Sequence, residues 1–134
     1  MKKLILILTI TLLTTITIFA QTAKSSVEVL YFKANLACCK AKSCNVLEAD
    51  IKDIIEKSYP TGNVVFKEVK LTDEANKALV EKYNAKSQTV IIVKKKKKKE
   101  TSTDVSDIVQ NYLKDQNKEK LKQDLLTKVD VKVK

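Results

Sequence analysis

After residue 26 the chain alternates between apolar and polar blocks that predict regular elements. The run Val27–Phe32 is rich in β-branched and aromatic residues and is apolar on both faces for most of its length, which is typical of a central strand covered on both sides. Apolar residues at helical spacing follow, with Cys44 on the same face as Leu47 and Ile51, and predict a helix that begins near Cys44. The stretch 59–63 holds the only Pro and the only Gly of the chain and is expected to end that helix.

The rest of the chain predicts three more strands and three more helices. Val64–Val69 and Gln88–Val93 are strand-like runs, and Glu100–Thr103 is a short polar strand. Between the first two of these runs, Thr72 is expected to cap a helix and Asn84 to end it in the left-handed conformation. The last two helices are expected to bury two apolar faces: Val105, Ile108, Val109, Tyr112 and Leu113 in one, and Leu121, Leu125 and Val129 in the other.

The resulting order of elements is β-α-β-α-β-β-α with a further C-terminal helix, which predicts an α/β fold around a central sheet of about four strands. The two βα crossovers predict parallel pairing of the first strands. The lysine run Lys94–Lys99 is expected to be the turn of an antiparallel hairpin between the third and fourth strands. A chain of 134 residues allows one domain, and a single Gly argues against a turn-rich β-sandwich.

Residues 1–20 are predicted to be a signal peptide and not part of the fold. Lys2 and Lys3 precede an uncharged apolar stretch, Leu4–Phe19, and Ala20 offers a small residue for cleavage. The stretch has about 16 residues, fewer than the roughly 20 that a helix needs to span a bilayer. We therefore expect a periplasmic or secreted protein, a domain of residues 21–134, and no stable membrane anchor after cleavage.

All 26 basic residues are Lys, and the formal net charge is +10. Without Arg the chain lacks the bidentate groups that read guanine, and without Trp base stacking is disfavoured, so nucleic acid is not an expected partner. We expect a solvated lysine surface, with an acidic partner protein or an anionic surface as the alternative role of Lys94–Lys99. The absence of His excludes Ser-His-Asp and Cys-His catalysis, and one Gly cannot form a phosphate-binding loop, so no cofactor is expected.

Cys38, Cys39 and Cys44 are the only cysteines, and they lie between the first strand and the helix that follows it. Helix N-termini stabilise thiolates, and an exported chain with three cysteines keeps at least one thiol unpaired within the chain. In thiol–disulfide exchange Cys39, which lies next to Lys40 and Lys42 and a helix N-terminus, would attack, with Cys38 as a substitute, and Cys44 on the apolar face would resolve. Five positions of one continuous helix leave two side chains roughly 140° apart, too far round the helix for a disulfide. The pairing is therefore possible only if the helix starts after Cys39 and the segment before it folds back.

Two other interpretations of the three cysteines stay open. Three thiolates from one loop suit a soft ion such as Cu(I), Hg(II) or As(III), with Cys38, Cys39 and Cys44 as its ligands. A closed zinc site is disfavoured because it takes four ligands and the chain has no His. Alternatively, Cys44 is a core residue without chemistry, because Cys is among the most buried residue types.

This order of elements, with cysteines after the first strand, resembles the thioredoxin-like fold over residues 27 to about 115. Within that superfamily the chain resembles the small exported family described as nitrophenyl compound nitroreductase subunit ArsF-like. The segments that carry the resemblance are Tyr31-Phe32, Cys44-Asn45-Val46-Leu47-Glu48, Val64-Val65-Phe66-Lys67 and Leu79-Val80-Glu81-Lys82-Tyr83-Asn84.

The resemblance implies a Cys-x-x-Cys pair whose second member precedes a Glu by four residues. Cys44 and Glu48 match that half, and the first half falls on Ala41. The chain also lacks the Trp-Cys-Gly-Pro-Cys motif and the cis proline that thioredoxins carry just before the third strand, where Ser87-Gln88-Thr89 stands. We expect an exported thioredoxin-like protein with thiol–disulfide redox or thiol-transfer activity toward protein thiols or disulfides; soft-ion binding and a non-catalytic interaction module are the alternatives.

Overall fold

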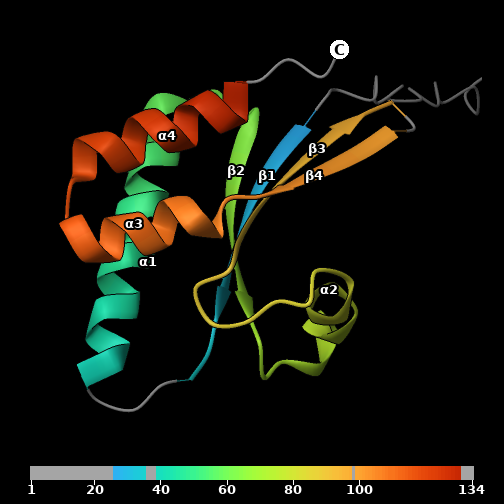
Figure 1. Ribbon diagram of the computed structural model, residues 1–134. Coiled ribbons are helices and arrows are strands. Elements are labelled where there is room, and N and C mark those ends of the chain that lie inside the picture. Colours follow the sequence, from blue (N-terminus) through green and yellow to red (C-terminus); the bar gives the residue numbers. More distant parts are fainter. Residues whose placement is uncertain (1–25, 36–38, 98, 131–134) are drawn as a thin grey trace, which may run out of the picture.

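A computed structural model describes residues 26–35, 39–97 and 99–130 (Figure 1). A four-stranded sheet in the order β2-β1-β3-β4 forms its middle layer. The strands are β1 (Ser26–Lys33), β2 (Val64–Lys70), β3 (Val90–Lys96) and β4 (Lys99–Asp104). β1 runs parallel to β2 and antiparallel to β3, and β3 runs antiparallel to β4, so β3 alone has the reverse direction.

Helices cover both faces of the sheet (Figure 1). One face carries α1 (Cys39–Ser58), α3 (Ser106–Asp115) and α4 (Lys118–Asp130). The other face carries a 3₁₀ turn, η1 (Glu74–Asn76), and the short helix α2 (Lys77–Lys82). The molecule is therefore an α/β fold of three layers, with the larger core on the side of α1.

β1 is the centre of the packing because both of its faces are buried. Val29 and Tyr31 belong to the core shared with α1, α3 and α4, and Leu30 and Phe32 belong to the smaller core beside α2. None of these four side chains is more than 2% exposed. Apolar side chains on both faces of one strand are buried only if layers cover both sides, which explains why β1 lies inside the sheet and not at its edge.

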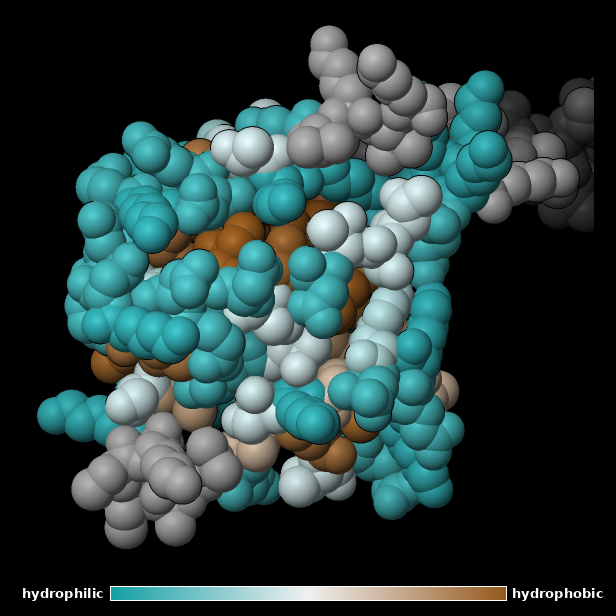
Figure 2. All heavy atoms as spheres, viewed as in Figure 1, coloured by the Kyte–Doolittle hydropathy of each residue, from teal (hydrophilic) through white to brown (hydrophobic). Residues whose placement is uncertain are grey.

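The outer surface is hydrophilic by contrast. Figure 2 shows hydrophilic side chains over the helical layer and toward the β3–β4 hairpin, with apolar atoms visible mainly between the helices and the sheet. Every residue of β4, Lys-Glu-Thr-Ser-Thr-Asp, is exposed. Charged and hydroxyl side chains on an edge strand disfavour pairing with the edge of another molecule.

Much of the sequence-based architecture is confirmed. The order of elements, the parallel pairing of β1 with β2 and the β3–β4 hairpin are as expected, and Asn84 has the left-handed φ of 45°. The apolar faces of the two C-terminal helices are buried as expected: Val105, Ile108, Val109, Tyr112, Leu121, Leu125 and Val129. Leu113 is only partly buried and packs against this core.

Two predictions about helix starts are wrong. α1 begins at Cys39 and not near Cys44, because Lys40, Ala41 and Lys42 are good helix formers that continue the helix N-terminal to its apolar face. The capping residue is Asp73 and not Thr72, and it caps the 3₁₀ turn η1 that leads into α2: its carboxylate accepts a hydrogen bond from the backbone N–H of Ala75 at 3.0 Å. A carboxylate is the better acceptor for an unpaired helix N–H group.

The second crossover, from β2 to β3, does not join parallel strands, contrary to the prediction from the two crossovers. α2 has six residues, a length of about 9 Å, which is too short to return the chain to the opposite end of the sheet. The chain therefore re-enters the sheet where it left: Leu71 N–H donates to Lys33 O at 2.9 Å, and Gln88 N–H donates to Phe32 O at 2.8 Å. β3 then runs antiparallel to β1.

The lysine run Lys94–Lys99 is not simply a turn, as was expected from its charge. Lys94, Lys95 and Lys96 belong to β3, and Lys99 begins β4. The ladder places Lys96 opposite Lys99 and Lys95 opposite Glu100. Backbone pairing with Thr101, Glu100 and Lys99 of β4 extends the hairpin through lysines that the pattern assigns to solvent.

The predicted signal peptide, residues 1–20, lies outside the described residues. Within the described ranges, no helix is both long and apolar enough to cross a membrane.

Replacing Ile51 with alanine should lower the free energy of unfolding by about 2–4 kcal/mol, because Ile51 is 0% exposed in the core beneath α1. Urea unfolding followed by circular dichroism measures the loss. Val46→Ala on the same helix is the matched control: Val46 is 49% exposed, and its replacement should stay within about 0.5 kcal/mol. Equal losses from the two variants would contradict the face that α1 turns to the sheet.

Candidate functional site

The three predicted site residues flank the junction of β1 and α1. Cys38 lies outside the described residues. Cys39 is the first residue of α1, and Cys44 lies five positions further along the same helix. Figure 1 shows that this end of α1 follows the end of β1 that is far from the β3–β4 hairpin.

Cys39 and Cys44 are not a disulfide pair while α1 is intact. Five helical positions advance the chain about 7.5 Å along the axis and rotate it by about 500°, so the two positions lie on different faces of the helix. A disulfide needs Cα atoms within about 7 Å and side chains that approach each other. The fold-back that the pairing required does not occur in α1, which already begins at Cys39.

Cys44 is a buried free thiol on the side of α1 that faces the sheet. It is 3% exposed. The side-chain amide of Gln88 donates a hydrogen bond to its Sγ at 3.2 Å, and the hydroxyl of Tyr31 donates to its backbone carbonyl at 3.2 Å. Three separate segments, β1, α1 and the loop before β3, therefore meet at this residue.

Gln88 is held in place by the central strand. Its backbone has a left-handed φ of 67°, its N–H donates to Phe32 O at 2.8 Å, and Phe32 N–H donates to Thr89 O at 2.9 Å. This two-way pairing anchors the loop to the end of β1. In the same loop the hydroxyl oxygen of Ser87 is buried and has no hydrogen-bond partner in the described part of the chain. An unsatisfied buried hydroxyl costs stability, so the Ser87 side chain does not hold this loop; the loop is held by its pairing with Phe32 and by the hydrogen bonds between Lys86 and Thr89.

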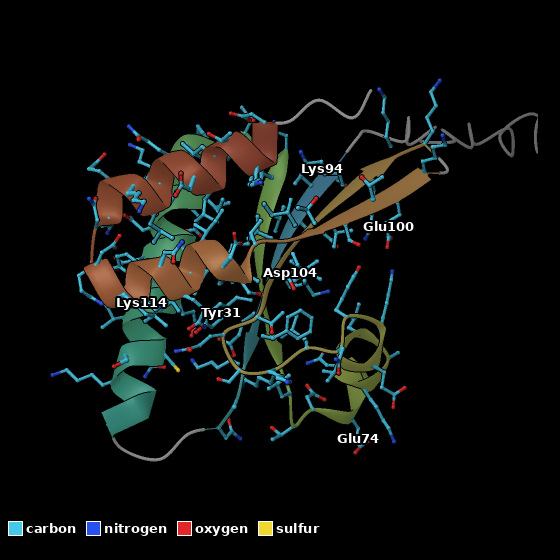
Figure 3. The ribbon with its side chains drawn as sticks, viewed as in Figure 1. Tyr31, Glu74, Lys94, Glu100, Asp104 and Lys114 are labelled. Atoms are coloured by element: carbon cyan, nitrogen blue, oxygen red, sulfur yellow. The ribbon has the colours of Figure 1, made fainter. Side chains whose placement is uncertain are left out.

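Three ionisable side chains lie on the same side of the sheet as Cys44. Lys33 Nζ, at the end of β1, is 2.5 Å from a carboxylate oxygen of Glu48 and 3.8 Å from one of Glu68. Glu48 follows Cys44 by one helical turn. Glu68 lies on β2, opposite Tyr31 of β1. Figure 3 shows Tyr31 on the side of the sheet that faces the α1–α3 layer.

The two carboxyl groups have opposite pKa shifts. Burial alone would raise the pKa of Glu48, but hydrogen bonds with Glu68 and Lys33 outweigh burial and hold it below its usual value. The same hydrogen bond with Glu48, together with burial, raises the pKa of Glu68. The pair thus retains one proton, on Glu68, to a higher pH than an isolated glutamate would.

Tyr31 stays neutral beside this pair. Burial first, and then electrostatic interactions with the Cys44 and Glu48 side chains, raise the pKa of its hydroxyl. A hydroxyl that keeps its proton remains a donor, and here the acceptor is the Cys44 carbonyl. Tyr31 therefore ties the second turn of α1 to the middle of the sheet.

A surface groove of about 250 Å³ runs between α1 and α3. On the α1 side Lys42, Ser43, Val46 and Leu47 line it, and on the α3 side Tyr112, Leu113 and Gln116. Cys39 precedes Lys42 by three residues and Ser43 by four, which is the spacing of positions on one face of a helix. By helical spacing the position of Cys39 falls on this face of α1, while Cys44 is buried on the side that faces the sheet.

Sequence reasoning found Cys44 and Glu48 but missed Lys33, Glu68 and Gln88. Glu68 had a detectable signal: it continues the two-residue alternation of Val64 and Phe66 and so falls on the inner face of β2. Gln88 stands where the resemblance places a cis proline, but no local pattern indicates its contact with Cys44, which joins residues 44 positions apart in sequence.

The soft-ion interpretation stays a prediction. Among the described residues, no group of three or more His, Cys, Asp and Glu side chains is arranged to hold a metal ion. The expected ligand set includes Cys38, which lies outside them.

Comparison with known proteins adds no family. No family model matches the chain, and no curated protein matches it. One solved structure, titled "Structure of a malarial protein", is similar at a TM-score of 0.40 and 23% identity, over 67% of this chain and 96% of that one. A likeness of that size carries no inference about fold or function.

Replacing Lys33 with methionine should lower the free energy of unfolding at pH 7 by about 1–2 kcal/mol, because it leaves the largely buried Glu48 carboxylate without its cation. The pKa of Glu48 is lower in the folded than in the unfolded chain, so its contribution is present above about pH 4.3 and is lost as the pH falls through the folded value. The difference between the variant and the parent should therefore shrink below pH 4. Urea unfolding at pH 7, 5 and 3.5 measures this; Lys67→Met, an exposed neighbour on β2, is the control and should show no such pH dependence.

In a Cys38→Ser/Cys39→Ser double variant, Cys44 should react with Ellman's reagent at least 100-fold more slowly in buffer than in denaturing urea. The reason is its 3% exposure beneath Gln88. Adding Gln88→Ala should speed the reaction in buffer, because the covering amide is removed. A rate in buffer equal to that in urea would show that Cys44 is not shielded.

Proposed function

We propose that this chain has a thioredoxin-like fold and carries out thiol exchange at the start of α1, with Cys39 as the attacking thiol. The observation that carries the proposal is the position of the cysteines. They follow the buried central strand β1 directly, in a sheet of order β2-β1-β3-β4 in which only β3 is reversed. The fold part and the thiol part of the proposal have separate support.

The arrangement of layers supports the thioredoxin-like fold. Helices α1 and α3 lie on one face, the short α2 lies on the other, and a β3–β4 hairpin leads into α3. The loop before β3 contacts the helix that carries the cysteines, through the hydrogen bond from Gln88 to Cys44. This is where the resemblance places a cis proline; Gln88 occupies the position with a trans peptide, because the described residues contain no cis bond.

Two features support Cys39 over Cys44 as the reactive thiol. Cys39 is at the N-terminus of a helix of 20 residues, where unpaired N–H groups and the helix dipole stabilise a thiolate. Cys44 is buried on the sheet side of the same helix and is covered by Gln88. A partner disulfide therefore reaches the first turn of α1 and not its second.

The chemistry is a pair of exchange steps. The Cys39 thiolate attacks one sulfur of a partner disulfide; the partner S–S bond breaks, a mixed disulfide forms, and the partner's other sulfur leaves as a thiolate. A second thiolate from outside α1 then attacks the partner sulfur of the mixed disulfide, which forms a new partner disulfide and releases Cys39 as a thiolate. No net oxidation occurs, and the helix geometry, which separates Cys39 from Cys44, is preserved throughout.

The groove between α1 and α3 supports the same direction of approach. Ser43 and Val46 line it and share their helical face with Cys39, and Val46 is 49% exposed. A partner segment that lies in the groove with an apolar side chain against Val46 has its next residues at the first turn of α1. Lys42 at the same end offers a cation to an acidic group of that segment.

Cysteine variants with a small disulfide probe test this proposal. After incubation with oxidised glutathione, mass mapping should find the adduct on Cys39 in the parent chain and in Cys44→Ser, and Cys39→Ser should lose at least 90% of it. The Cys44→Ser variant should unfold at a lower urea concentration, because its hydroxyl replaces a buried thiol.

Two outcomes contradict the proposal. One is that all the thiols stay free under oxidising conditions. The other is that Cys44→Ser abolishes the adduct while its circular dichroism spectrum remains that of the parent.

A further inference from the structure

We infer that the β3–β4 hairpin is a docking surface for anionic lipid headgroups, which holds the protein with the start of α1 turned away from the membrane. The surface, called here the basic hairpin, consists of the described lysines of the run: Lys94, Lys95, Lys96, Lys97 and Lys99. Docking to lipid is a function separate from thiol exchange and does not depend on it.

The tip of the basic hairpin carries uncompensated charge. Further from the tip, Lys95 pairs with Glu28 at 3.0 Å and Lys94 Nζ donates to the backbone carbonyl of Lys128 at 2.8 Å. Lys96, Lys97 and Lys99 are exposed, and none of the three has an ion-pair partner within the described residues. Three cations thus project from one end of the sheet.

The hairpin tip is built at a local cost to stability. Lys96 lies directly opposite Lys99 in the ladder, and like charges opposite each other destabilise a strand pair. Lys97 has a left-handed φ of 54°, which Gly or Asn adopts more readily than Lys. Edge protection alone does not require either feature, since single lysines along β4 would suffice. A surface selected for its charge density explains both.

Before cleavage of the predicted signal peptide, the length of the chain would keep this end of the molecule near a membrane. β1 starts at Ser26, which is paired with Lys95 of the basic hairpin. The apolar stretch Leu4–Phe19 ends seven residues earlier, so even a fully extended connection spans at most about 25 Å. A bilayer that held the uncleaved apolar stretch would therefore lie within about 25 Å of the hairpin's paired base. Lysines close to a surface of anionic lipid headgroups are attracted to it by its negative potential.

Docking at this end orients the thiol site. β1 has eight residues and is about 26 Å long, and the hairpin and the start of α1 lie beyond its opposite ends (Figure 1). Figure 3 shows Lys94 and Glu100 on the hairpin side, and Glu74 toward the other end of the molecule. A protein held by the basic hairpin therefore presents the first turn of α1 to partners away from the lipid surface.

Lipid headgroups fit the surface better than an acidic protein. A lysine ammonium is a point charge on a flexible stem and does not demand the fixed bidentate geometry that Arg favours. The three lysines are dispersed over a strand end and a turn without an apolar pocket between them, so nothing in the described part of the hairpin fixes one partner orientation. A fluid layer of phosphates satisfies such a surface without a shaped partner.

Vesicle co-sedimentation tests the inference with the full chain. The probes are phosphatidylcholine vesicles with and without 30% phosphatidylglycerol, at 50 and 500 mM NaCl. The neutral vesicles report any binding through the apolar N-terminal stretch. We expect at least tenfold tighter binding to the anionic vesicles at 50 mM NaCl, and loss of that difference at 500 mM because salt screens exposed charges.

Two triple variants with the same change in charge separate the hairpin from net charge. Lys96→Gln/Lys97→Gln/Lys99→Gln should lose most of the anionic preference, and Lys77→Gln/Lys86→Gln/Lys114→Gln should keep it. The control lysines are also exposed but lie outside the hairpin. Lys96→Arg/Lys97→Arg/Lys99→Arg should retain the preference, which excludes a loss caused by a disrupted hairpin.

Three results would overturn the inference. Equal losses in the two glutamine triples would assign the binding to net charge. Unchanged binding in the hairpin triple would assign it elsewhere. Tighter binding of soluble polyglutamate than of the anionic vesicles, at matched charge and salt, would favour an acidic protein partner. Because Cys39→Ser leaves the hairpin intact, it should not affect lipid binding, so failure of the thiol proposal and failure of this one are distinguishable.

Discussion

Burial of β1 on both of its faces is the constraint on which the rest of the structure depends. Its side chains alternate between the core under α1 and the core beside α2, so both layers are necessary and neither replaces the other. The same strand sets the two ends of the molecule. Its first residue pairs with the lysine hairpin, and its last residues bind the loops before β3 and after β2 and lead toward the cysteines.

The region around Cys44 shows how this constraint builds a site. Tyr31 and Lys33 are two residues apart on one face of β1; the first holds the backbone of α1 and the second holds Glu48. Gln88 reaches Cys44 because its backbone is fixed to Phe32. Cys44 is therefore a buried thiol held by three separate segments. The proposed exchange mechanism uses the first turn of the helix instead.

Local patterns were a good guide wherever one element decided the outcome. The inner positions of α3 and α4 follow from apolar spacing, because a helix exposes one face and buries the other whatever its neighbours are. They were a poor guide where two elements compete. Lys40 to Ser43 suit a helix as well as a loop, and Lys94 to Lys96 were assigned to a turn by their charge although β4 offered them a ladder of backbone hydrogen bonds.

The sequence by itself determined the order of elements, the central strand, the buried helical faces and the three cysteines as the candidate chemistry. Those features depend on periodicity and residue type, which are local. Only the tertiary structure decided that Cys39 and Cys44 lie on different faces of one helix, that Lys33 joins two glutamates, and that Gln88 covers Cys44. These depend on which distant segments β1 brings together, and on a helix start that no single residue specifies.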